Sequence, residues 1–142
     1  MYRVRCIDPD DEDACDTIKE LDVLCGLAEY AKIEPGEKGD WWLVYYGDEP
    51  IGYAGLTQSS FAHDYGYLKR AGVLPAHRGN GIQRRLIKVR ERRARQYHWQ
   101  ALITDTTANP ASSNSLIRAG FTLFEPAYRW AYKDSLYWRK YL

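Results

Sequence analysis

The chain has 142 residues, of which 45% are hydrophobic and 27% charged, a composition too apolar for a disordered protein and sufficient for one buried core. It contains no run of about 18 apolar residues and no N-terminal signal-peptide pattern, and its three cysteines lack the spacing of a disulfide framework or a zinc site. We therefore expect a single cytoplasmic domain over residues 1–142 with no membrane segment and no metal.

The net charge of +1 conceals a strong asymmetry between the two halves of the chain. Residues 1–64 hold fifteen acidic and five basic side chains, whereas residues 65–142 hold four acidic and fifteen basic ones. The basic half is expected to attract a polyanionic ligand. A simpler interpretation is that the two halves pair with each other at the surface.

Hydrophobic periodicity and turn residues predict alternating strands and helices. Asp8-Pro9 and the acidic residues that follow favour a helix start, and the aromatic residues flanking Gly47-Asp48 favour a β-hairpin. In chain order we expect an edge strand over 2–7, a helix over 11–20, an ambiguous segment over 22–40 with a short second helix, a hairpin over 41–57, a strand over 65–74, a helix over 81–97, a strand over 101–104, a helix over 110–119, a strand near 121–124 extending to 132, and a strand over 136–141. This order indicates an α/β (α+β) fold with a mixed sheet.

The most informative segment is residues 73–87, in which a strand leads through a turn with two glycines into an amphipathic helix. Gly79 and Gly81 allow the backbone to curl so that several N–H groups converge on one point. The helix N-terminus behind them adds unsatisfied amides and a partial positive charge. The pattern predicts a phosphate or pyrophosphate site, although a structural turn without a ligand is the alternative. The further residues that a Rossmann or Walker loop requires are missing.

These residues resemble the acetyl-CoA motif of the GNAT superfamily of N-acetyltransferases. Val73-Leu74-Pro75 matches the end of the family's strand, and Arg78-Gly79-Asn80-Gly81-Ile82-Gln83 matches the loop except at Gln83, where relatives have a small residue. Asn109-Pro110-Ala111-Ser112 and Arg118-Ala119-Gly120-Phe121 resemble a second family segment in the right order and at the right interval. The resemblance covers most of the chain.

The resemblance implies a mixed, mostly antiparallel twisted sheet with flanking helices, in which the strands at 68–74 and 101–105 splay apart. It also implies acetyl-CoA as co-substrate, attacked directly by an amine in a ternary complex. A main-chain amide near Val73 or Leu74 would polarise the thioester carbonyl. The implied cofactor-binding residues are Val73, Leu74, Arg78, Gly79, Asn80, Gly81, Ile82, Gln83, Asn109, Ser112 and Asn114.

The catalytic acid and base are not apparent from the sequence. Many relatives carry a tyrosine where this chain has Leu116, and the strand at 68–73 lacks the carboxylate that relatives often place there. Asp105, Tyr128 and Tyr132 are the candidates for proton transfer. Their alternative roles are a turn or cap for Asp105 and strand packing for the two tyrosines.

The acidic half favours a cationic amine acceptor such as a polyamine, an aminoglycoside, a lysine or an N-terminal amine. Seven basic residues between Arg84 and Arg95 would also suit a nucleic-acid-binding helix. A solvated helix face near the phosphates of the cofactor explains them more simply, so nucleic acid is not expected as the main partner. A catalytically silent acetyl-CoA-binding module is the other alternative, and the aromatic terminal strands suggest a homodimer.

Overall fold

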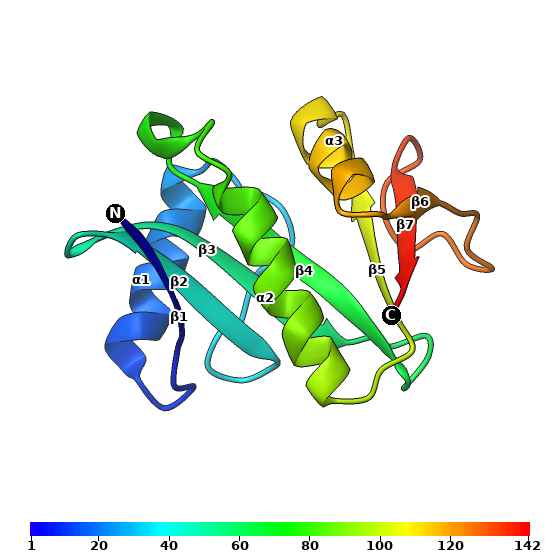
Figure 1. The fold of residues 1–142 in the computed structure, drawn as a ribbon, viewed down its shortest axis with the longest axis horizontal. Coiled ribbons are helices and arrows are strands. Elements are labelled where there is room, and N and C mark those ends of the chain that lie inside the picture. The colour runs from blue at the N-terminus through cyan, green and yellow to red at the C-terminus, as the bar shows by residue number, and fades with distance from the viewer. The chain divides into compact units, whose positions relative to one another are not determined.

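The computed structural model describes residues 1–142 as two compact units. The first consists of Met1–Thr57 and Lys69–Leu86, and the second of Gln58–Leu68 and Ile87–Leu142. Two elements, strand β4 (Tyr65–Val73) and helix α2 (Ile82–Gln96), run through both units (Figure 1). None of the helices combines the length and hydrophobicity that crossing a membrane requires.

The first unit is built on antiparallel strands. In it, β1 pairs with β2 from Tyr2 opposite Tyr46 onward, and β2 pairs with β3 with an irregularity between Val44 and Tyr45. Its elements are β1 (Tyr2–Cys6), α1 (Glu12–Leu24), β2 (Asp40–Tyr46), β3 (Glu49–Gln58), the end of β4, the 3₁₀ turn η1 (Pro75–His77) and the start of α2.

Helix α1 supplies one side of the core of this unit. Ile18 and Leu21 pack with Trp41, Leu43 and Tyr53 of the strands, and each of these side chains is almost fully buried. The run of apolar residues in β2 has both of its faces covered, which explains why it does not alternate with polar residues.

The predicted end of the first helix at residue 20 and the separate helix after it are wrong. Helix α1 begins behind the Asp11 cap, whose carboxylate accepts from the Ala14 amide, and continues to Leu24. Leu21 extends the apolar stripe of the same helix, and Gly26, at φ 73°, provides the left-handed residue that ends it.

The second unit contains the parallel part of the sheet. Strand β5 runs parallel to β4 from Tyr65 opposite Ala101 to Tyr67 opposite Ile103, and antiparallel to β7 over its whole length. Its elements are the start of β4, most of α2, β5 (Ala101–Thr106), α3 (Pro110–Arg118), β6 (Thr122–Leu123) and β7 (Leu136–Tyr141).

The strand predicted to extend to residue 132 is much shorter, because β6 ends at Leu123. Pro126 lacks an N–H for a strand ladder, and Arg129 instead bridges the Glu125 carboxylate and the Ser135 carbonyl. Residues 124–135 therefore form an irregular connection.

The hydrogen-bonded strand order is β1-β2-β3-β4-β5-β7-β6. The predicted mixed, mostly antiparallel sheet is confirmed. The described ladder between β4 and β5 ends at Tyr67 and Ile103, and the Thr104 hydroxyl donates to the Leu68 carbonyl at 3.0 Å. Main-chain pairing thus covers only the first residues of this parallel pair.

Candidate functional site

The turn between β4 and α2 has the backbone geometry that its glycines predict. After η1 the chain is extended at Arg78 and left-handed at Gly79 (φ 80°) and Gly81 (φ 74°), and α2 begins at Ile82. The Asn80 side-chain amide donates to the His77 carbonyl at 3.0 Å, which holds the turn closed from within. A Cβ atom placed on either glycine would meet no atom within 4 Å, so the space beside both residues is open.

The backbone amides of this turn are not used by the protein. None of the N–H groups from Gly79 to Arg84 donates to a main-chain or side-chain acceptor, and the first intrahelical bond is that from the Arg85 amide to the Gly81 carbonyl. Helix α2 has no acidic residue in its first turn. Open space, unpaired donors and the positive end of the helix dipole make this turn a candidate anion site. Residues 79–83 form this turn and the start of α2, and their role as phosphate ligands stays a prediction.

The two residues considered for polarising a carbonyl differ in their hydrogen bonds. The Leu74 amide donates to the Ile51 carbonyl at 2.8 Å and is therefore committed to β3. Because successive amides of a strand point to opposite edges, the Val73 amide points away from β3. The Val73 carbonyl accepts the Arg78 Nε atom at 3.0 Å, which links the end of the strand to the turn. Of this pair, only the Leu74 amide is shown to be committed to β3, and the Val73 amide points to the opposite edge.

His77 borders the turn and contacts two tyrosines of the first unit. Its Nδ1 atom shares a hydrogen bond of 2.9 Å with the Tyr2 hydroxyl, and its ring lies 5.3 Å from that of Tyr46. The Arg85 guanidinium donates to the Tyr2 carbonyl at 3.2 Å. These contacts attach strand β1 to the phosphate-loop region of the same unit.

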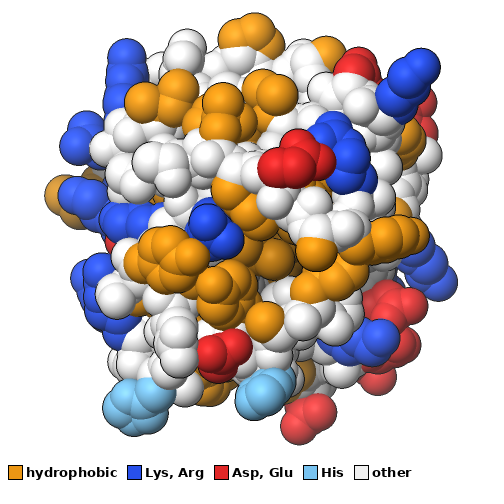
Figure 2. All heavy atoms as spheres, turned by 90° about the vertical axis from the view of Figure 1, so that its right-hand side faces the viewer, with side chains coloured by type: hydrophobic (Ala, Val, Ile, Leu, Met, Phe, Trp, Pro, Cys, Tyr) orange, Lys and Arg blue, Asp and Glu red, His pale blue; other side chains and the backbone are white.

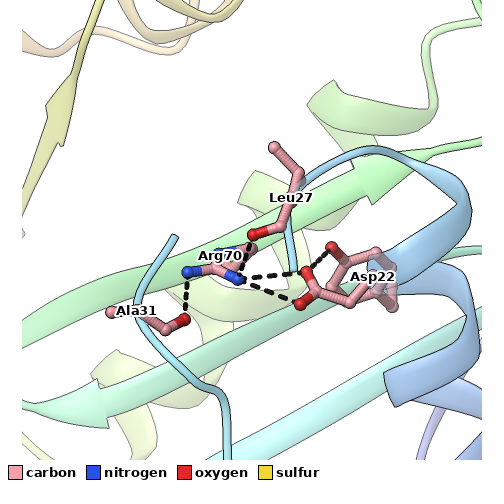
Figure 3. Close-up of polar contacts among 5 residues, drawn as sticks. Asp22, Leu27, Ala31 and Arg70 are labelled. Atoms are coloured by element: carbon pink, nitrogen blue, oxygen red, sulfur yellow. Dashed lines mark hydrogen bonds and ion pairs between the residues drawn. The ribbon is translucent and has the colours of Figure 1, made fainter. Parts of the chain in front are cut away.

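A buried charged cluster in the first unit was not predicted from the sequence (Figure 3). Arg70 of β4 contacts Asp22 of α1, with Nη1 3.0 Å from Oδ2, and also donates to the carbonyls of Leu27 and Ala31. The sequence held one usable signal, because Asp22 lies four residues after Ile18 on the apolar face of α1, where a carboxylate needs a buried partner.

Tyr53 completes this cluster. Its hydroxyl donates to the Asp22 carboxylate, and its side chain is fully buried. Burial, together with the hydrogen bond to Asp22, raises the pKa of Tyr53 far above its ordinary value. Asp22 is thus held by both a guanidinium and a phenol, and Arg70 holds the chain after α1 through the carbonyls of Leu27 and Ala31.

In the second unit, Asp105 lies within β5 opposite Tyr137 and not in a turn, which makes the alternative role of turn or cap residue wrong. Its Oδ2 atom accepts the Tyr67 hydroxyl at 2.6 Å and the Trp130 indole N–H at 2.9 Å. The carboxylate is thus oriented by two aromatic side chains.

The other two candidates for proton transfer lie in the irregular connection before β7. Tyr128 and Tyr132 are exposed, and the alternative of strand packing is wrong for both because neither belongs to a strand. The Tyr128 ring lies 5.8 Å from that of Phe61. Leu116, at the position where relatives carry a tyrosine, is buried on the inner face of α3.

The residues predicted to bind the pantetheine arm lie at α3. Asn109 caps this helix, since its Oδ1 atom accepts the Ser112 amide at 3.1 Å, and Asn114 is exposed on its surface. The structural role considered for Asn109 is therefore confirmed, and its Nδ2 atom is not used in the cap.

The comparisons with known proteins decide the family. The model of the "Acetyltransferase (GNAT) family" matches residues 3–121. The chain belongs to the GNAT acetyltransferase family. No curated protein matches it in sequence.

Solved structures of acetyltransferases share the fold. The IAA acetyltransferase from Bacillus cereus superposes with a TM-score of 0.76 at 16% identity, over 100% of both chains. The ribosomal-protein-alanine N-acetyltransferase from Brucella melitensis gives 0.71 at 21% identity, over 99% of both chains. The acetyltransferase of Bacillus subtilis, solved in complex with CoA, gives 0.72 at 14% identity, over 100% of this chain and 99% of that one.

The GNAT turn of this chain fits a diphosphate. An anion of that size needs several converging donors and a backbone that it can approach closely, and the open side of Gly79 and Gly81 with the free amides up to Arg84 supplies both. No group of three or more potential metal ligands occurs in the structure.

Proposed function

We propose that this GNAT protein transfers the acetyl group of acetyl-CoA to a primary amine by direct attack in a ternary complex. The observation that carries the proposal is the run of amides from Gly79 to Arg84 that have no acceptor and face open space at the start of α2. Membership of an acetyltransferase family supports the reaction class.

The glycine turn and the end of β4 would bind and polarise the donor. The amides of the turn would hold the diphosphate, and Arg78 and Arg84 add positive charge beside it. The amide of Val73 would donate to the thioester carbonyl and stabilise the oxyanion that forms during attack, a contribution of about 3 kcal/mol for one donor. Fixing the thioester relative to the amine would supply much of the remaining acceleration.

Proton transfer would use one of the three candidate side chains or water. The acceptor ammonium must lose a proton before its nitrogen can attack, and the leaving thiolate must gain one. Asp105, Tyr128 and Tyr132 are the proposed candidates, of which the two tyrosines are exposed and carry a transferable proton. Leu116 cannot serve as an acid, so the group that protonates the thiolate must differ from the tyrosine common in relatives.

Calorimetric titration with acetyl-CoA tests the proposal. Gly81→Asp would place a side chain and a negative charge in the anion site, and we expect it to abolish binding. Gly26→Asp is the matched control, because Gly26 has a similar φ of 73° and equally open surroundings but lies at the end of α1. Equal affinity of the wild type and a folded Gly81→Asp variant would refute the proposed site.

A catalytically silent acetyl-CoA-binding module is the second candidate function, favoured by the buried Leu116 in place of a tyrosine. Release of free CoA thiol in the presence of a panel of amines separates the two. An enzyme releases thiol at a rate that depends on the amine, whereas a silent module binds acetyl-CoA without amine-dependent release. The acidic N-terminal half leads us to propose a cationic acceptor.

A further inference from the structure

A carboxylate and a set of aromatic rings lie together in the second unit. Trp130 donates its indole N–H to Asp105, and the same ring lies 4.9 Å from Phe61. Phe61 in turn lies 5.8 Å from Tyr128. We call Asp105, Phe61, Tyr128 and Trp130 the aromatic–carboxylate cluster. It joins the end of β5 to the segment before β4 and to the connection before β7.

The carboxylate of this cluster has no cationic partner. Both of its hydrogen bonds, from Tyr67 and Trp130, are to Oδ2 and come from neutral donors, and it forms no ion pair with a lysine or arginine. Its Oδ1 atom accepts no hydrogen bond, and it is not among the buried polar atoms that lack a partner, since the structure has none. The carboxyl group is therefore oriented by two neutral donors and has no ion-pair partner.

The rings of the cluster are accessible and equally free of cations. Phe61 is 52% exposed and Tyr128 is 66% exposed. Neighbouring rings of the same unit are already covered, since Arg129 lies over Tyr137 and Arg139 over Phe124. No arginine or lysine covers Phe61, Tyr128 or Trp130. Figure 2 shows hydrophobic side chains gathered on the side of this unit that carries β6 and β7.

A carboxylate beside aromatic rings that carry no cation matches the chemistry of an organic cation. The ring faces attract positive charge through their quadrupoles, and they also pack against the alkyl part of the ligand. A carboxylate alone would bind water or any small cation, whereas rings alone would bind any apolar group. The combination selects a group that is both charged and apolar.

We propose that the aromatic–carboxylate cluster binds an alkylammonium group and that this group belongs to the acceptor. The second part of this inference depends on the proposed acetyltransfer, whereas the first part does not. Asp105 then binds the ammonium group of the acceptor, and the rings favour an ammonium that is attached to an alkyl chain.

Binding of n-butylammonium, measured by calorimetry and by tryptophan fluorescence without acetyl-CoA, tests the cluster. We expect it to bind at least about tenfold more tightly than the neutral isostere 1-butanol. Asp105→Asn keeps an oxygen that can accept from Tyr67 and Trp130 and should abolish this preference. Phe61→Leu with Tyr128→Leu should weaken ammonium binding about fivefold or more. Tyr141→Leu, which removes another exposed aromatic residue of the unit, is the matched control and should change nothing.

Equal binding of butanol, or unchanged butylammonium binding in a folded Asp105→Asn variant, would overturn the inference. A second measurement compares butylammonium with a lysine peptide that is acetylated at its N-terminus and keeps its side-chain ammonium. Binding of either cation supports the cluster, and the tighter one indicates whether the acceptor is a small amine or a peptide. Titration of the same samples with acetyl-CoA separates the proposed acetyltransfer from the proposed ammonium site. Failure to bind acetyl-CoA would refute the acetyltransfer, whereas the butylammonium measurement would still test the cluster.

Discussion

Arg70 on β4 and Asp22 on α1 form an ion pair in which only 13% and 5% of the two side chains are exposed. The guanidinium also donates to the carbonyls of Leu27 and Ala31, so it fixes the irregular chain that follows α1. Charges in such a place must be mutually compensated, because each is costly to bury alone. The pair therefore determines the path of residues 25–33.

Asp22→Ala should lower the free energy of unfolding by about 3–5 kcal/mol, because it leaves the Arg70 guanidinium buried without its counter-charge. Urea denaturation followed by circular dichroism measures this. Arg129→Ala is the control, since it breaks the exposed pair with Glu125, and it should cause little change. A loss below about 1 kcal/mol in Asp22→Ala would show that Arg70 is satisfied by the carbonyls alone.

Tyr53 should make stability fall at alkaline pH. Its pKa is raised in the folded protein by burial and by the bond to Asp22, so the folded state keeps the phenolic proton above pH 10, where an unfolded tyrosine loses it. Unfolding then releases a proton, and the free energy of unfolding decreases as the pH rises above about 10.

Tyr53→Phe isolates this contribution from those of the other tyrosines. At neutral pH the variant should be less stable by about 1 kcal/mol, because Asp22 loses one donor. The difference in free energy of unfolding between wild type and variant should decrease as the pH increases above about 10. Denaturation curves of both proteins from pH 8 to 11 measure this difference. A difference that does not change with pH would contradict the raised pKa of Tyr53.

The conformation of the turn between β4 and α2 could be predicted from sequence because its determinants are local. Gly79 and Gly81 fix a backbone that only glycine adopts readily, and Ile82 opens an amphipathic helix directly after them. The strands and helices with clear periodicity were predicted for the same reason. None of these features depends on residues distant in the chain.

The buried cluster and the aromatic–carboxylate cluster could not be predicted because they join distant segments. Asp22 meets Arg70 across 48 residues, and Asp105 meets Tyr67 across 38. Sequence shows that a carboxylate is present but not which donor the topology brings to it. The prediction of a strand from residue 124 to 132 was wrong for a similar reason, since the bond from Arg129 to the Ser135 carbonyl competes with strand pairing.

Asn109→Ala should destabilise the protein by about 1 kcal/mol, because the Ser112 amide loses its cap at the start of α3. Acetyl-CoA affinity should fall only modestly. Asn114→Ala on the exposed face of the same helix is the matched control, and thermal unfolding should show no loss of stability for it. Complete loss of acetyl-CoA binding in Asn109→Ala would instead assign its free Nδ2 atom a major role toward the cofactor.

Gly79→Ala separates backbone strain from ligand binding. The new methyl group meets no atom of the protein, so the variant should lose only about 1–2 kcal/mol of stability, the cost of a left-handed conformation. The same methyl group enters the space where the diphosphate would lie, so acetyl-CoA affinity should fall by about tenfold or more. Gly47→Ala in the β2–β3 turn, at φ 60° and in equally open surroundings, should show a similar stability loss with unchanged affinity. If both variants bound acetyl-CoA as the wild type does, the open side of the turn would not be the side on which the anion lies.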